Sequence, residues 1–182
     1  MKGWFKLALL LILSGVLGGC NTNPFRPSTV TFTAAQLQTA LAKKFPIEKQ
    51  YLNLIDLTVD HPEVSLSPAT NRVIIQLDAG IIMPGHDQQI QGKLNISSEL
   101  VYDPGSKSVI LKDPRLEAQQ IDGVSSVVTQ VLNQLAAVVI EEKLDGASVY
   151  KFNPDDLRFL GMRLVPERIE ITGQGIVIHI VK

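Results

Sequence analysis

Two long alternating runs in the middle of the chain constrain its fold most strongly. Apolar and polar residues alternate from Arg72 to Met83 and again from Gln89 to Tyr102. A period of two is typical of a strand with one buried face. One face of the first run holds Val73, Ile75, Leu77, Ala79 and Ile81. Runs of about 12–14 residues extend roughly 40–47 Å, so we expect a long, curved antiparallel sheet.

Turn residues mark where these strands end. Asp103-Pro104-Gly105-Ser106 predicts a tight hairpin turn. The return strand is expected from Ser108 to Gln120, with Pro114 at a bulge or edge position because proline cannot donate to a ladder. Further strands are expected at 51–60, 64–66, 162–166, 168–172 and 176–181. The sequence therefore predicts mostly antiparallel neighbours.

Two helices are expected beside the sheet. Thr33 is a favourable N-cap for a helix from Ala34 to Phe45, which Pro46 would end. A Val-rich stripe predicts a second helix of about 21 residues, roughly 30 Å long, from Gly123 to Leu144. The expected class is α+β: a long curved antiparallel sheet wrapped around a long helix in the C-terminal half, plus an N-terminal helix.

The start of the chain has the pattern of an export signal. Lys2 and Lys6 precede an apolar run that ends at Leu17-Gly18-Gly19-Cys20. This small pair before a cysteine resembles the lipobox of bacterial lipoproteins. The resemblance implies that residues 1–19 are a signal peptide and that Cys20, the one cysteine of the sequence, carries diacylglycerol and an amide-linked acyl chain such as palmitate. The alternative is a cleaved secretory signal followed by a chance cysteine.

Lipidation would fix the protein to a membrane, because two acyl chains suffice for stable anchoring. Residues 20–30 would be the lipidated N-terminus and a tether, and residues 31–182 a single domain. Asn21 stands where the bacterial sorting pattern has Asp for inner-membrane retention. The expected location is therefore the cell envelope, lipid-anchored to the outer membrane and facing the periplasm.

Composition and motifs argue against several function classes. Lys and Arg number 17 against 18 Asp and Glu, so no basic excess favours nucleic acid. His61, His86 and His179 lie in no metal-binding spacing. Asp155-Asp156 is expected in the first turn of a short helix, where carboxylates favour the helix dipole. We expect no catalytic residue, metal or cofactor, and hence no enzyme.

The segment after the tether resembles the YceB-like family of bacterial lipoproteins, a domain of unclear function. Residues that carry the resemblance are Phe32 to Leu41, Lys43-Lys44-Phe45-Pro46, Asn71-Arg72 and the hairpin from Asp103 to Lys112. The family resembles a single unit of the tubular lipid-binding (TULIP) fold. That resemblance implies a curved sheet around a long helix and an apolar tunnel for acyl chains.

Two functions follow as hypotheses. In the first, the protein binds or carries a lipid or another hydrophobic ligand. Candidate wall residues are Leu37, Leu41, Ile75, Leu77, Leu94, Ile96, Val127, Val128, Val131, Leu135 and Val138. A dry, close-packed core would use the same residues. In the second, the protein is a non-enzymatic scaffold for envelope assembly that recruits a protein partner at a sheet edge.

Overall fold

The computed structural model describes residues 28–85, 89–121, 126–153, 155, 157–159 and 162–181. The helices are α2 (Ala34–Ala42) and α3 (Ser126–Leu144). The strands are β1 (Ser28–Phe32), β2 (Ile47–Tyr51), β3 (Ile55–Ser67), β4 (Arg72–Ile82), β5 (Ile90–Asp103), β6 (Ser108–Ile121), β7 (Ser148–Lys151), β8 (Arg158–Phe159), β9 (Met162–Arg163), β10 (Val165–Thr172) and β11 (Gly175–Val181). The predicted signal, Cys20 and most of the tether lie outside the described residues.

The expected α+β class, with a sheet around a long helix, is wrong. The described residues are mainly β, with eleven strands and two helices of 9 and 19 residues. At 1.5 Å per residue α3 is about 28 Å long, whereas a 14-residue strand reaches about 46 Å. The helix is therefore shorter than the strands beside it and is no central axis. Strands β2 and β7, where the sequence predicted no element, and β8, where a short helix was expected, add to the strand content.

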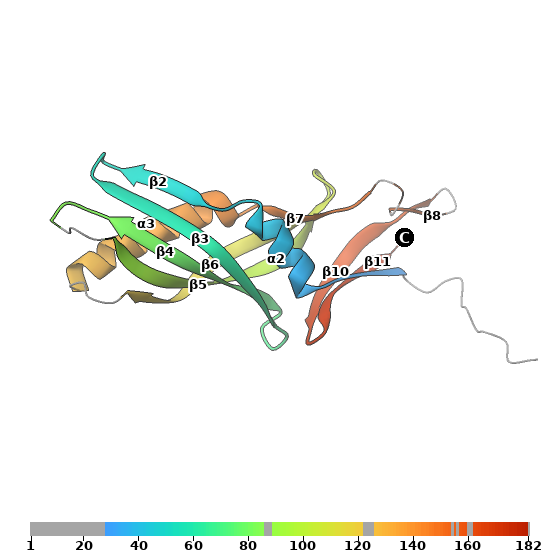
Figure 1. The fold of residues 1–182 in the computed structure, drawn as a ribbon. Helices are drawn as coiled ribbons and strands as arrows, with labels where there is room; N and C mark the ends of the chain where they lie inside the picture. The colour runs from blue at the N-terminus through green and yellow to red at the C-terminus, as the bar shows by residue number, and fades with distance from the viewer. Residues whose placement is uncertain are drawn as a thin grey trace, which may run out of the picture.

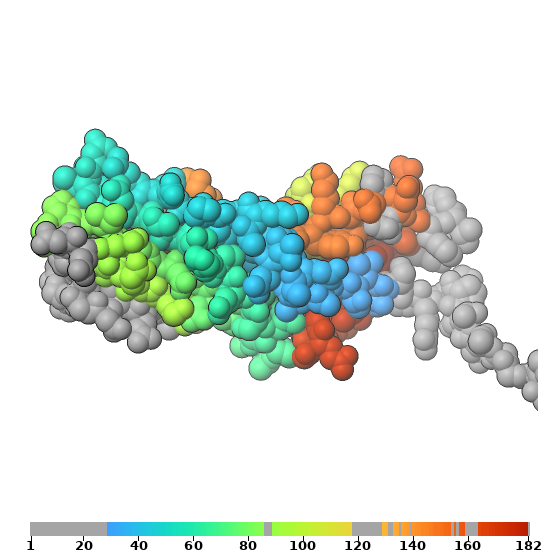
Figure 2. Space-filling model, in the orientation of Figure 1, coloured from blue at the N-terminus to red at the C-terminus, as the bar shows by residue number. Residues whose placement is uncertain are grey.

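The strands form two main sheets. Six antiparallel strands follow the order β2-β3-β4-β5-β6-β7, and three follow β1-β11-β10. Strands β8 and β9 pair separately. The six-stranded sheet is long and curled, α3 runs along one end of it, and α2 lies between the two sheets (Figure 1). The outline is elongated, with the β2–β3 turn at the opposite end from β1 (Figure 2).

The alternation in β4 and β5 is confirmed by burial. The five predicted inward residues of β4 are each 2% exposed or less. Leu77 pairs with Leu94, and Ile75 pairs with Ile96, across neighbouring strands. The hairpin turn is also confirmed, because the Asp103 carboxylate accepts from the backbone N–H of Gly105 and Ser106. Period-two burial thus places the core on one face of the six-stranded sheet.

The structure differs from the sequence-based prediction in two local segments. A strand ending at Asp60 and a separate one at Val64 prove to be the single strand β3, with a bulge between Asp60 and Glu63. The short helix expected at 154–160 is not formed at Arg158–Phe159, which is a strand. By contrast, Thr33 caps α2 as expected, in a capping box with Gln36.

Polar and aromatic contacts join the two main sheets. Asn71, in the turn between β3 and β4, donates from Nδ2 to the Ile169 carbonyl at 3.1 Å. Its Oδ1 accepts from the Ile171 N–H at 2.8 Å. The amide thus takes the place of a neighbouring strand at the outer edge of β10. Phe32 of β1 stacks on Tyr150 of β7 with ring centroids 5.3 Å apart. The sheets share one hydrophobic core.

Candidate functional site

Six of the predicted cavity residues lie in the centre of the hydrophobic core. All are 2% exposed or less, and they come from α2, β4 and β5: Leu37, Leu41, Ile75, Leu77, Leu94 and Ile96. None of them is among the residues that line the two hollows described below. The structure therefore brings these six together as core side chains.

The remaining predicted cavity residues belong to α3. Side chains of Val127, Val128, Val131 and Leu135 lie outside the described part of the structure. Val138 lies at the surface, with its side chain 54% exposed. The helix instead buries Ala136, Ile140 and Leu144, at 4%, 4% and 1% exposure. Spacing of four residues places these three on one helix face, which is the face turned toward the sheet.

A hollow of about 360 Å³ lies between α3 and β6. Leu116, Ala137 and Ile140 form its apolar wall, and Lys112, Asp113, Pro114, Glu141 and Asp145 form its polar part. It opens here because β7 pairs with β6 only as far as Ile110. Past that point, α3 lies beside β6. Ligand sites occupy about 300–1,000 Å³, so this hollow is large enough for a small amphiphile.

Ion pairs fix the polar end of the hollow. Lys112 Nζ of β6 lies 2.8 Å from the carboxylate of Asp145, just after α3. The other Asp145 oxygen accepts from the Asp113 N–H at 3.1 Å. The hydrogen bond from Lys112 lowers the pKa of the Asp145 carboxyl and raises the pKa of the Lys112 ammonium. This end therefore holds α3 against β6, and its Asp113 carboxylate is paired in turn with Arg72 and Arg115.

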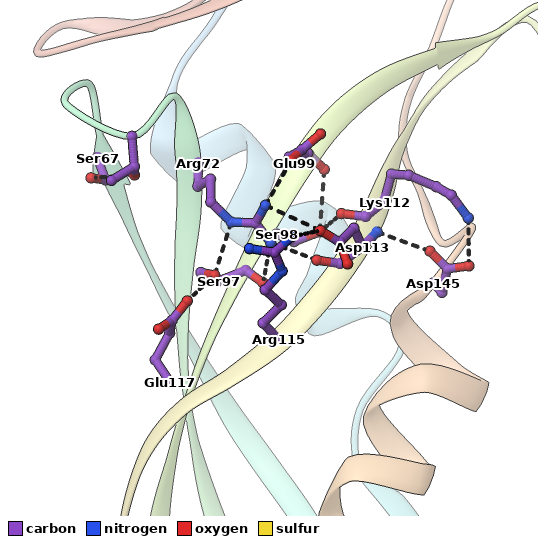
Figure 3. A network of polar contacts seen from close by, with 11 residues as sticks. Ser67, Arg72, Ser97, Ser98, Glu99, Lys112, Asp113, Arg115, Glu117 and Asp145 are labelled. Atoms are coloured by element: carbon purple, nitrogen blue, oxygen red, sulfur yellow. Dashed lines mark hydrogen bonds and ion pairs between the residues drawn. The ribbon is translucent and has the colours of Figure 1, made fainter.

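A buried arginine supports the bulge of β6 behind the hollow (Figure 3). Arg72 is 8% exposed. Its guanidinium donates to Ser97 Oγ at 2.9 Å and to the Glu99 carboxylate at 2.8 Å. It also donates to the carbonyls of Ser97 and Asp113. Asp113 has a left-handed φ of 50°, so its backbone departs from the β5–β6 ladder. Arg72 then donates the hydrogen bond that the Asp113 carbonyl would otherwise lack.

One polar atom on the inward side of α3 has no partner. Asn133 lies seven residues before Ile140, so both share a helix face. Its Oδ1 is buried and accepts no hydrogen bond in the described structure. Ala137, which lines the hollow, follows one turn later. A buried, unpaired acceptor is uncommon in folded proteins, and Asn133 is not among the residues that line the hollow.

A second hollow, of about 240 Å³, lies between β1 and β11. Phe32, Thr33 and Gly175 are among the residues that line it. Gly175 has a φ of 157°, and a Cβ there would lie 2.9 Å from the Phe32 carbonyl oxygen. Its lining residues are threonines, Gln174, Gly175 and apolar residues, and none of them is charged. The α3–β6 hollow therefore offers the richer chemistry.

Of the histidines and acids weighed in the sequence, His61 and His179 lie in different sheets, and His86 and Asp156 lie outside the described residues. His61 lies at the β3 bulge beside Asp60 and Asp78. His179 of β11 contacts Glu170 of β10 at 3.2 Å. Within the described residues, no three His, Cys, Asp or Glu side chains are placed to hold a metal ion. Neither helix there has the length and apolarity needed to span a membrane.

Sequence reasoning missed the residues that shape this site. For Asn133, the sequence signal was an amide side chain on the inward face of a Val-rich predicted helix. Nothing in the local sequence marks Arg72 as buried, because its burial depends on a bulge two strands away. Lys112 and Asp145 are 33 residues apart and meet only in the folded chain.

The family model described as "Protein of unknown function (DUF1439)" matches residues 32–174. Since this match covers most of the sequence, the chain belongs to that family. No curated protein matches the chain.

Proposed function

We propose that this protein is a non-enzymatic, membrane-anchored carrier of a lipid or a similar hydrophobic ligand. The hollow between α3 and β6 is the binding site in this proposal. The single observation that supports it best is the composition of that hollow. Leu116, Ala137 and Ile140 supply an apolar wall, and a few charged groups lie at one end. Binding sites for amphiphiles combine an apolar surface with few polar anchors.

The proposed carrier is related to the YceB-like lipoproteins and to tubular lipid-binding (TULIP) proteins. Support comes from the curled antiparallel sheet and from membership of the matched family. The six core residues from Leu37 to Ile96 then serve to hold the sheet in its curled shape. The ligand is expected at the junction of helix and strand, where the sheet is not continued by β7.

Anchoring is the second part of the proposal. Lipidated Cys20 holds the domain on the outer membrane, where it faces the periplasm. Support comes from the lipobox-like sequence Leu17 to Cys20. Replacing Cys20 with serine should release the protein from washed membranes, and the same protein retained there would contradict the anchor. Alanine in place of Asn21 serves as the matched control and should leave the protein membrane-bound.

Ligand binding is tested with the full chain carrying Cys20→Ser, which leaves residues 28–182 unchanged. Fluorescent derivatives of a fatty alcohol, a fatty acid and a phospholipid are titrated separately. We expect saturable binding of at least one probe. Ala137→Trp should abolish it by filling the hollow, whereas Val138→Trp, on the exposed face of the same helix, should not. Absence of saturable binding to every probe would contradict the carrier.

A second candidate function is a scaffold that binds an envelope protein. Leu52 and Leu54 lie in the β2–β3 turn and are 87% and 60% exposed, and Ile82 of β4 is 49% exposed. Asp56 pairs with Ile82, which places all three at one end of the sheet. Crosslinking in cells from position 54 and, in a separate variant, from position 137 in the hollow distinguishes the two functions. One specific protein adduct favours the scaffold, and a lipid adduct at the hollow favours the carrier.

A further inference from the structure

Leu52 is exposed in a backbone conformation that does not suit leucine. It lies in the β2–β3 turn with a left-handed φ of 52°, and Asn53 follows with a φ of 54°. The N–H of Leu54 donates to the Tyr51 carbonyl at 3.0 Å and closes the turn. Two left-handed central residues are typical of a type I′ turn, where asparagine and glycine are preferred. The Leu52 side chain is 87% exposed, so packing within the described chain does not offset this strain.

An apolar tip surrounds Leu52 at one end of the six-stranded sheet. We define it as residues 51–55 and 82–85, which contain no charged side chain. Ile82 of β4 pairs with Asp56 of β3, so the two segments lie at the same end of the sheet (Figure 1). Leu54 and Ile82 are both exposed there. Exposed apolar patches mark sites that bind a protein or a membrane.

The N-terminal tether is too short to cover the tip. Strand β1, which follows the tether, lies at the opposite end of the elongated domain (Figure 2). From Cys20 to Ser28, a fully extended chain covers at most about 29 Å. Strand β3 alone extends roughly 44 Å between Ser67 and the tip. With Cys20 anchored as proposed, the tip therefore lies far from the anchor and is open to another occupant.

The chemistry of the tip favours a lipid bilayer over a protein. Protein interfaces centre on Trp, Tyr and Arg side chains, and leucine is under-represented among the residues that dominate binding. The most exposed side chains of the tip are leucines. The hydrogen bond between Leu54 and Tyr51 pairs backbone groups that hydrocarbon could not satisfy. Tyr51 itself is half-buried beside the turn, and tyrosine is enriched at membrane–water interfaces.

We propose that this tip docks on the surface of a phospholipid bilayer, with Leu52 and Leu54 inserted at the level where headgroups meet acyl chains. Lys49, on the strand before the turn, is paired with Glu142 and is not free to attract anionic headgroups. Docking is therefore expected on zwitterionic phosphatidylcholine, and it should change little with salt. The inference goes beyond the carrier function, since the docking itself uses neither the hollow nor Cys20.

Vesicle flotation measures the docking. The protein is the processed form, residues 20–182 with Cys20→Ser, because the apolar signal would itself bind vesicles. We expect phosphatidylcholine vesicles to float this protein with saturable dependence on lipid. Leu54→Ser should weaken the binding at least roughly tenfold, the effect of no longer burying one leucine side chain. Val101→Ser is the matched control, because Val101 is an exposed valine of β5 near the Asp103 turn, and it should leave binding unchanged.

Leu52→Asn separates docking from folding. Asparagine adopts a left-handed φ more readily than leucine, so the variant should unfold at the same or a higher urea concentration than the unchanged protein. Its vesicle binding should nevertheless fall at least roughly tenfold. A variant that is less stable but floats as before would assign Leu52 to the fold and overturn its role in docking.

A label at the tip reports insertion directly. Cys20→Ser removes the one cysteine of the sequence, so Leu54→Cys gives a single site for the fluorophore NBD. Its emission should shift to shorter wavelength when vesicles are added, and the same label at Val101→Cys should show no shift. Equal responses at the two positions would overturn insertion of the tip.

The remaining outcomes separate bilayer docking from a protein interface and from the carrier function. Flotation of no protein, or flotation that Leu54→Ser leaves unchanged, would overturn the docking while the ligand probes still test the hollow. Dimers that Leu54→Ser abolishes, or one envelope protein crosslinked at position 54, found without vesicle binding, would assign the tip to a protein interface and overturn the proposal. Docking that persists when the hollow binds no probe would support the tip and contradict only the carrier.

Discussion

Lys49 of β2 and Glu142 of α3 form an ion pair across 93 residues of sequence, with Nζ 3.0 Å from the carboxylate. Strand β2 is one edge of the six-stranded sheet, and β6, next to the other edge, is held to the end of α3 by Lys112 and Asp145. The end of α3 is therefore held both to β2, at one edge of the sheet, and to β6, near the other edge. This arrangement requires the sheet to curl, because in a flat sheet three strands would separate β2 from β6.

Removing the Lys49–Glu142 pair should loosen α3 at its C-terminal end. Both side chains are partly exposed, so we expect only a weak coupling free energy between them, and a still weaker one at high salt. The measurement is a double-mutant cycle with Lys49→Met and Glu142→Gln, read by urea unfolding. Hydrogen exchange at the end of α3 should increase in either variant.

The control for this cycle is the pair Lys93–Asp78, which joins neighbouring strands at 2.8 Å. Its removal should leave exchange in α3 unchanged. If the Lys49 variant also leaves α3 exchange unchanged, the ion pair does not help to hold the helix on the sheet.

The contact between Asp145 and Lys112 should weaken in acid. The pKa of Asp145 lies below its ordinary value in the folded protein because Lys112 donates a hydrogen bond to its carboxylate. A lowered folded-state pKa stabilises the fold above the ordinary value of about 3.9, and this contribution is lost as the pH falls through the folded-state pKa. Urea unfolding at pH 7 and at about pH 3 measures the effect.

Asp145→Asn provides the comparison, since its side chain does not titrate. The variant should be less stable than the unchanged protein at pH 7, and the difference should shrink at pH 3. A difference that stays constant between the two pH values would show that the charge of Asp145 contributes nothing.

Asn71 should couple the two main sheets. Alanine at this position removes the hydrogen bonds to Ile169 and Ile171. It also keeps a Cβ atom at a left-handed φ of 52°, which alanine adopts less readily than asparagine. We expect a loss of about 1–3 kcal/mol in the free energy of unfolding. Asn71→Gly separates the causes, because glycine adopts this φ without strain. A glycine variant as stable as the unchanged protein would show that the loss in Asn71→Ala comes from backbone strain alone and that the two hydrogen bonds contribute nothing.

Arg72 should be the most costly polar residue to replace. Arg72→Lys keeps the charge but cannot serve Ser97, Glu99 and the Asp113 carbonyl at once, so buried acceptors lose their donor. We expect a loss of about 2–4 kcal/mol. Arg115→Lys is the matched control, since Arg115 is 62% exposed, and surface changes usually stay within about 0.5 kcal/mol. Equal losses in both variants would contradict the role of the buried guanidinium.

The parts of the fold that follow from local pattern could be predicted from the sequence. Alternation in β4 and β5, the Asp103 turn and the Thr33 cap depend on residues within a few positions of one another. The class could not be predicted, because β2 and β7, with five and four residues, carry little pattern and become strands through their partners β3 and β6. The Val-rich segment does form a helix, but its stripe alone does not reveal how the sheet lies against it.

The candidate site was less predictable than the fold. Six aliphatic residues were correctly placed inside the protein, but an apolar pattern does not distinguish a packed core from the wall of a cavity. The hollow arises where β6 continues beyond β7, which is a property of strand lengths in three dimensions. Its polar residues, from Lys112 to Asp145, are brought together by that geometry.

Native mass spectrometry of the Cys20→Ser chain, purified from cells without detergent, tests the central claim most directly. We predict one bound amphiphile per protein, retained in Val138→Trp and lost in Ala137→Trp, which fills the hollow between α3 and β6. A protein that carries no bound amphiphile, or one that keeps it after Ala137→Trp, would contradict a ligand site in this hollow.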